Sequence, residues 1–315
     1  MPGFFSGILD KLRGSPRTRA TFLAAFGKHP GWNDHMDDLG LQSAQLIDLR
    51  RLLYVQGISG NIDSGAWESL APEQRLETFR HLMLWRSGNS LVLARLWSSS
   101  DGKGRRKYPM IVAAQADHLP APWLIDKAGP ILERLETEFA ATPDAAVVRS
   151  GMDRARAELA ELALPEPEVP PDDNPGPLAT LADRPEMGPD HSKLCILLYH
   201  IERELAAFLK GTRSPAGAPR HMRVPACADS PAAAIALWSR FFETQLDPSA
   251  MLLLFAPLDG TWIDLIAGEP SPTQFFCVRA RPGVVPLATD IPYNLDAAFV
   301  AKVEQMLPPR DSSMQ

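Results

Sequence analysis

Cysteine is scarce in this chain of 315 residues, and its three cysteines, Cys195, Cys227 and Cys277, are widely separated in the second half. No two of them have the close spacing that a zinc site or a redox dithiol requires. An odd number of separated cysteines is typical of free, partly buried thiols in a reducing compartment. We therefore expect neither a disulfide framework nor a cysteine-rich metal site.

Long hydrophobic runs are missing as well. The longest, residues 251–258, is far shorter than the ~20 apolar residues that span a bilayer. Asp10, Lys11 and Arg13 interrupt the apolar stretch near the start that a signal peptide would need as its core. The sequence therefore predicts a cytoplasmic protein without a transmembrane segment.

The chain has no excess of positive charge. Its 32 Lys and Arg against 38 Asp and Glu give a formal net charge of -6, which disfavours a broad nucleic-acid or anionic-membrane surface. Hydrophobic residues make up 45% and charged residues 22%, as in ordinary globular proteins. At roughly 150 residues per domain, this length predicts about two domains, each with a core of its own.

A segment rich in proline and acidic residues, 165–189, divides the chain. Because proline removes backbone donors and disfavours helix, we expect an extended linker or surface excursion there. We therefore predict an amphipathic and basic N-terminal segment (1–20), an α/β domain (21–164), the linker (165–189) and a C-terminal α/β domain (190–315).

Apolar periodicity predicts alternating strands and helices in both halves. In the front half we expect strands at 21–26, 81–85, 91–97 and 108–115, and helices at 43–55, 123–139 and 143–162. In the back half we expect strands at 221–224, 251–255, 262–267 and 275–279, and helices at 191–209, 231–244 and 295–307. The fold class is therefore layered α/β, a mixed sheet packed with helices, with a structural duplication of the two halves as a hypothesis.

The densest group of candidate functional residues lies in a polar loop at 26–38. His29, Asp34, His35 and Asp37 combine imidazoles and carboxylates, which are the ligands of divalent-metal sites. A hydrolase could use such a metal to acidify water. However, no second His and acidic cluster supplies further ligands, so a metal-dependent hydrolase is the alternative hypothesis and no metal is our main expectation.

A second group lies at 98–109, where glycines precede a basic run. Lys103, Arg105, Arg106 and Lys107 could bind phosphate or a phosphopeptide through guanidinium groups and backbone amides. The spacing is not that of a P-loop, and a solvated hairpin loop explains the same residues.

A third stretch, 55–67, contains three glycines. We expect Gly57, Gly60 and Gly65 to let the chain turn, with Trp67 as an anchor. Neither Ser59 nor Ser64 lies in a Gly-x-Ser-x-Gly elbow. The sequence thus shows no complete catalytic set and no cofactor motif.

Two short motifs in the front half are similar to those of a known family. The first has an aromatic-Gly-Lys-x-Pro pattern followed by an aspartate: Phe26, Gly27, Lys28, Pro30 and Asp34. The second has Ser and Asp, then Gly-Arg and an aromatic-Pro pair that opens a strand: Ser100, Asp101, Gly104, Arg105, Tyr108 and Pro109. Over residues 21–140 the chain resembles the TagF family of bacterial type VI secretion-associated proteins. It resembles a divergent member, because Gly31, Trp32 and Asn33 stand where the family usually has Ser-Arg-Gly.

The resemblance implies a non-enzymatic, cytoplasmic accessory protein without a cofactor. Members of the TagF family are associated with post-translational repression of the secretion machine, in some systems through an FHA-domain scaffold protein. The expected partner is therefore a protein, either such a scaffold or a component of the type VI membrane complex. Lys28, Asp34 and Arg105 are candidates for polar anchors of the interface, and contacts that brace the loops explain them equally well.

Overall fold

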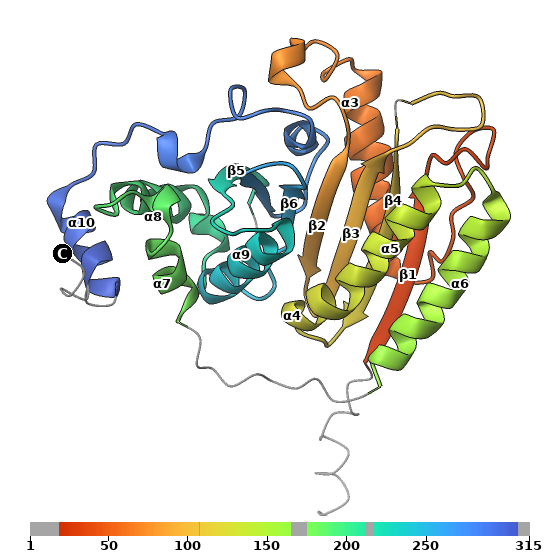
Figure 1. The fold of residues 1–315 in the computed structure, drawn as a ribbon. Coiled ribbons are helices and arrows are strands. Elements are labelled where there is room, and N and C mark those ends of the chain that lie inside the picture. The colour runs from red at the N-terminus through yellow and green to blue at the C-terminus, as the bar shows by residue number, and fades with distance from the viewer. Residues whose placement is uncertain (1–18, 107, 165–174, 212–216, 308–315) are drawn as a thin grey trace, which may run out of the picture.

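The computed structural model of the chain describes residues 19–106, 108–164, 175–211 and 217–307 (Figure 1). Nearly all of the predicted N-terminal segment thus lies outside the described residues. The described part contains a seven-stranded sheet in the order β1-β4-β3-β2-β6-β7-β5. Its strands are β1 (Ala20–Gly27), β2 (Arg80–Ser87), β3 (Ser90–Ser98), β4 (Pro109–Asp117), β5 (Arg220–Pro225), β6 (Leu252–Pro257) and β7 (Trp262–Ala267).

The mixed α/β class is confirmed, although the sheet itself is antiparallel throughout rather than mixed. Short loops join β2 to β3 and β6 to β7, and such loops can only reverse the strand direction. Strands β2 and β6 pair directly, with Arg86 opposite Leu252, so one sheet runs through both halves of the chain. The division into domains and the duplication stay predictions.

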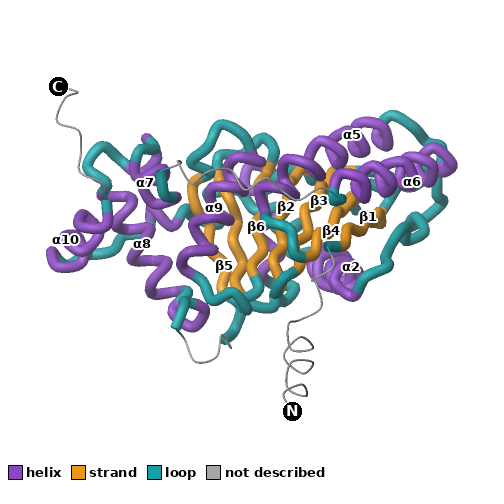
Figure 2. Tube along the Cα trace, turned by 90° about the horizontal axis from the view of Figure 1, so that it is seen from below, coloured by secondary structure: helices purple, strands orange, loops and turns teal. Residues whose placement is uncertain are grey.

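Helices cover both faces of this sheet (Figure 2). On one face lie α4 (Ala121–Trp123), η3 (Leu124–Ala128), α5 (Gly129–Ala140), α6 (Ala145–Leu162) and α9 (Pro231–Gln245). The other face carries a continuous helical run made of α2 (Ala44–Leu49), η1 (Arg50–Ser59) and α3 (Gly60–Asp63). Side chains of β2 alternate between two apolar cores, with Leu84 in the first and Trp85 in the second.

The remaining short elements lie around these layers. They are η2 (Pro72–Gln74), α7 (Pro177–Ala182), η4 (Pro185–Met187), α8 (Ser192–Glu204), η5 (Ala206–Phe208), η6 (Gln274–Val278), η7 (Ala288–Asp290) and α10 (Ala297–Met306). Within the described ranges, no helix is both long enough and apolar enough to cross a bilayer.

The expected strand at 275–279 is wrong, because these residues form the 3-10 helix η6. Strand β5 pairs directly with β7, and the Cys277 carbonyl accepts a hydrogen bond from the Arg223 guanidinium at 3.2 Å. The apolar side chains that suggested a strand are buried all the same, since Phe275 packs against Phe255 in the second core.

The expected turns at Gly57 and Gly60 are also wrong, because both glycines are helical. A Cβ on Gly57 would lie 2.5 Å from the Phe275 ring, so this glycine permits close packing rather than a turn. Gly65 does turn the chain, with a φ of +69°. Trp67 is buried as expected, and its indole N–H donates to the Phe276 carbonyl at 3.0 Å.

The expectation of an extended segment over all of 165–189 is wrong for its second part. Residues 165–174 lie outside the described residues, but helix α7 follows, with proline in its first turn where a missing N–H has no consequence. Leu181 and Met187 are fully buried in the first core, so this part packs on the sheet layers.

Candidate functional site

The two motifs, separated by more than 60 residues in sequence, meet where β1 ends and β4 begins. Gly27 lies opposite Met110, and the Lys28 N–H donates to the Pro109 carbonyl at 3.1 Å. Gly27 has a φ of +117°, and a Cβ there would lie 2.3 Å from the Pro109 oxygen. Only glycine allows this approach, which sets the following lysine against the second motif.

Lys28 is the centre of the site. Its side chain is only 4% exposed, and its ammonium donates to Asp101 Oδ2 at 2.7 Å and to Asp34 Oδ1 at 2.9 Å. The Asp101 side chain is fully buried, whereas that of Asp34 is 66% exposed. One buried cation therefore joins an inner and an outer carboxylate.

The loop after β3 folds around Asp101. Its Oδ1 accepts the backbone N–H groups of Lys103 and Arg105, both at 3.0 Å, and Arg105 Nε donates to Oδ2 at 2.6 Å. Burial raises the pKa of Asp101, but these hydrogen bonds and the one from Lys28 outweigh burial and hold its pKa below the ordinary value. Asp101 is therefore ionised at neutral pH and organises the loop.

Arg105 connects the inner pair to the surface. Its guanidinium, 50% exposed, lies 3.0 Å from Asp34 Oδ1 and donates to the Asn33 carbonyl at 3.1 Å. The hydrogen bond from Lys28 and the positive charge of Arg105 lower the pKa of Asp34. Lys28, Asp34, Asp101 and Arg105 form one network, which we call the Lys28–Asp101 site, and Asp34 and Arg105 are its exposed rim.

Aromatic rings line the inner side of this site. Lys28 Nζ lies 5.8 Å from the centre of the Tyr108 ring, and the His35 ring meets the edges of Tyr108 and Tyr54. His35 Nδ1 is 2.9 Å from the Tyr54 hydroxyl. Burial lowers the pKa of His35, and the charge of Lys28 lowers it further. The motifs did not indicate Tyr54, because it belongs to η1, whose regular apolar spacing predicted only a core helix.

The other motif residues shape the two loops. Phe26 is buried in the second core, and Gly104 adopts a φ of +77°. Sequence reasoning missed Gly102, whose N–H donates to the Trp32 carbonyl at 2.7 Å. A Cβ on Gly102 would lie 3.0 Å from the Pro30 carbonyl oxygen, so the glycine lets the loops touch. Ser100 is partly buried beside Asp101 in the same loop.

The structure does not bring the four alternative metal ligands together. Both ring nitrogens of His29 are in use, since Nε2 donates to the Phe139 carbonyl and Nδ1 accepts from the Gly31 N–H, each at 3.0 Å. Asp37 accepts from Trp32 and Arg149, while His35 faces Tyr54 and Asp34 faces Lys28. Each of the four side chains therefore has a separate structural partner.

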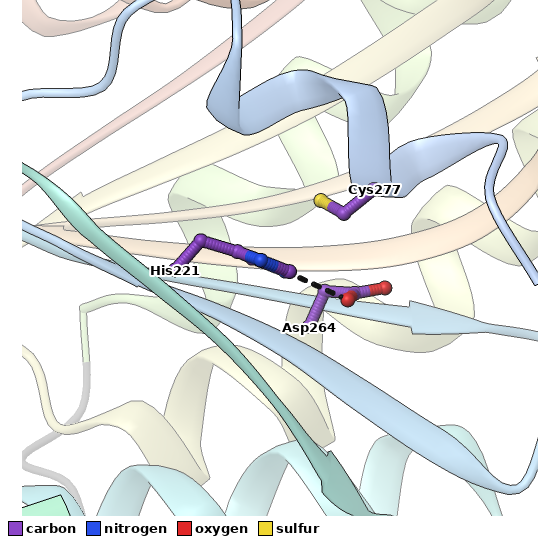
Figure 3. Close-up of side chains that lie close together, drawn as sticks. All are labelled: His221, Asp264 and Cys277. Carbon is purple, nitrogen blue, oxygen red and sulfur yellow. Dashed lines mark hydrogen bonds and ion pairs between the residues drawn. The ribbon is translucent and has the colours of Figure 1, made fainter. Parts of the chain in front are cut away.

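Where the structure describes the chain, the group with metal-ligand atoms within 4.8 Å of one another is His221, Asp264 and Cys277 (Figure 3). Asp264 accepts four hydrogen bonds: from His221 Nε2 at 2.9 Å, Arg223 Nε at 2.9 Å, Arg223 Nη2 at 2.8 Å and Trp262 Nε1 at 3.1 Å. Its oxygens are saturated, and the fully buried Arg223 guanidinium would repel a cation.

Cys277 in this group is a poor ligand and a poor nucleophile. Burial raises its pKa well above the ordinary value, so the thiol stays protonated. All three cysteines are free and buried. The buried Arg223–Asp264 ion pair, to which His221 is hydrogen-bonded, therefore braces β5, β7 and η6.

The proposed phosphate-binding loop does not present its cations together. The guanidinium of Arg105 is engaged by two carboxylates, and Lys103 contributes a backbone N–H to Asp101. Arg106 is exposed, and Lys107 lies outside the described residues. The loop is thus organised around its own aspartate.

Comparisons with known proteins found no protein-family model that matches this chain and no curated protein that matches it. The geometry of the two motifs therefore carries the functional argument.

Proposed function

We propose that this chain is a TagF-like, non-enzymatic accessory protein of a type VI secretion system. It would act in the cytoplasm by stoichiometric binding of a protein partner and repress the machine after translation. The observation that carries the proposal is the Lys28–Asp101 contact, which unites the two segments of the resemblance in one network. Contact between these segments is what a shared functional face would require.

The state of the ionisable groups favours binding over catalysis. Lys28, Asp34, Asp101 and Arg105 neutralise one another, and hydrogen bonding keeps the pKa of both carboxylates below ordinary values. A general base needs a pKa near the working pH, which these carboxylates are far from having. Ionised carboxylates held in this network support a rigid, charged binding surface rather than a catalytic base.

The rim of the site has the character of an interface. Arginine is enriched in protein interfaces because its planar fork can stack and can form paired hydrogen bonds. Arg105 and Asp34 remain half or more exposed, while buried Lys28 and Asp101 hold them in place. We propose that the partner, an FHA-domain scaffold or a membrane-complex component, contacts this rim.

The test is affinity purification of the tagged full chain from its native host, with mass spectrometry of the co-purified proteins. Recovery of an FHA-domain scaffold or a type VI membrane-complex component supports the proposal. Metal analysis of the same sample tests the hydrolase alternative: stoichiometric zinc or manganese on a chain without a partner would contradict binding as the function.

Variants then locate the interface. We expect Asp34→Ala and Arg105→Ala to weaken the complex about ten-fold or more, as interface anchors do. Arg134→Ala is the matched control, because Arg134 forms a comparable exposed pair with Glu158 on the neighbouring helix layer. Equal affinity of all three variants, with unchanged thermal midpoints, would remove the Lys28–Asp101 site from the interface.

A further inference from the structure

A cavity of about 580 Å³ lies at the opposite end of the nine-residue strand β3 from the Lys28–Asp101 site. The turn between β2 and β3, the loop from β4 to α4, and Glu243 of helix α9 contribute to its lining. Its lining includes Arg19, Arg86, Asn89, His118, Ala121 and Glu243. The volume lies within the range of small-molecule sites, roughly 300–1,000 Å³.

Arg86 is the unusual member of this lining. It is only 8% exposed, and it lies in the middle of the sheet between Leu91 of β3 and Leu252 of β6. Its Nε has no hydrogen-bond partner, and Nη2 reaches the Ala250 carbonyl only at 3.5 Å. Throughout the described residues, no carboxylate lies within ion-pair distance of this guanidinium.

A buried cation in this state is costly. Desolvation lowers the pKa of Arg86, and the charges of Glu243 and Asp247 compensate only in part and from a distance. The contrast with Arg223 is direct, because that buried arginine has a carboxylate on its fork and three backbone carbonyls around it. Arg86 therefore lacks the acceptors that a buried guanidinium normally has.

The charge of the cavity favours an anion. Arg86 is the buried charged residue of its lining, and it is positive in a chain whose formal net charge is -6. Glu243 is exposed, and its Oε1 accepts a hydrogen bond from Ser239 at 3.3 Å. The guanidinium fork fits the paired oxygens of a carboxylate or a phosphate.

We infer that this cavity binds the oxyanion group, carboxylate or phosphate, of a small organic molecule, with Arg86 as the residue that holds it. The bound anion supplies the guanidinium of Arg86 with the negative charge that its protein surroundings lack. This site is independent of the proposed protein-binding face.

The test uses the full chain and two probes, inorganic phosphate and citrate, against chloride at equal ionic strength. Both probes also stabilise proteins by exclusion from their surface, so the variant Arg86→Gln measures that general effect. We expect a larger, saturable rise in the thermal midpoint for the native chain than for Arg86→Gln. In calorimetric titration, Arg86→Gln should bind the probe that the native chain prefers at least ten-fold more weakly than the native chain does.

Arg106→Gln is the matched control, because it removes the same charge from the exposed loop at the other end of β3. It should bind the probe like the native chain. If Arg86→Gln does not fold, Arg86→Lys takes its place, because it keeps the charge but loses the planar fork, and weaker binding of the probe is again expected. Equal midpoint shifts in all chains, or loss of binding only in Arg106→Gln, would overturn the inference. The probe that binds more tightly identifies the oxyanion as carboxylate or phosphate.

Discussion

The buried charged residues of this fold differ in how many partners neutralise them. Arg223 is 0% exposed and is fully satisfied by Asp264, by backbone carbonyls and by the Trp262 ring at 4.9 Å. Lys28 is satisfied by two carboxylates, but Arg86 has almost no partners. A buried charge without a neutralising partner is rare, which is the observation behind the inferred anion site at Arg86.

Removal of Arg223 from its buried ion pair with Asp264 should strongly destabilise the protein. We expect Arg223→Met to lower the free energy of unfolding by about 3–5 kcal/mol, because Asp264 is left buried without its cation. Arg223→Met with Asp264→Leu should recover at least half of that loss. Urea denaturation measures both, and a double variant less stable than the single one would contradict this account.

At the scale of elements, the contact between α5 and α6 depends on one glycine. Gly151 lies in α6, and a Cβ there would lie 2.7 Å from Cε1 of the buried Phe139 in α5. Two effects compete at this position. Alanine is the better helix former by about 1 kcal/mol, whereas a forced overlap in a packed core costs about 1–3 kcal/mol.

We expect the overlap to prevail, so Gly151→Ala should lower the free energy of unfolding by roughly 1 kcal/mol. Gly60→Ala is the matched control, since Gly60 is also helical and its Cβ would come no closer than 3.4 Å to the Pro272 side chain. This control should raise stability by a few tenths of a kcal/mol to about 1 kcal/mol. Thermal unfolding of both variants measures these changes in stability. A change of the same sign in both would show that packing against Phe139 does not determine the effect of Gly151→Ala.

At the scale of the whole molecule, the pairing of β2 with β6 unites the two halves of the chain in one sheet. His81, opposite Pro257 in this pairing, is only 1% exposed. Burial lowers the pKa of His81 to about 4, so it stays neutral in the folded protein at mildly acidic pH. The unfolded chain, with an ordinary histidine pKa of about 6.5, takes up a proton there.

Stability should therefore fall as pH decreases from about 6.5 to about 4, because the unfolded state binds a proton that the folded state does not. His81 alone accounts for roughly 3 kcal/mol over this window. Burial also lowers the pKa values of His29, His35 and His200, so the native chain should lose more than this amount.

The test is urea denaturation at several pH values for the native chain and for His81→Gln. The variant should show a slope of unfolding free energy against pH that is smaller by up to about 1.4 kcal/mol per pH unit. Identical slopes would mean that His81 titrates normally in the folded state.

Local patterns predicted much of this fold. Alternating apolar residues located the seven strands of the described sheet. Apolar residues at helical spacing located α5, α6, α8, α9 and α10. The motifs also identified Lys28, Asp34, Asp101 and Arg105. The strand prediction for 275–279 failed because its apolar spacing also suits a 3-10 turn, and the Cys277 carbonyl accepts from Arg223, more than 50 residues earlier.

Sequence alone thus determined the α/β class, the strand positions and the charged residues of the site, because these follow from periodicity and residue type. Only the tertiary structure decided that the strands form one sheet, that Tyr54 lies beside His35, and that Arg86 is buried without a carboxylate partner among the described residues. These properties depend on contacts between segments far apart in the chain, and a residue's partners follow from where the backbone places it rather than from its neighbours in sequence.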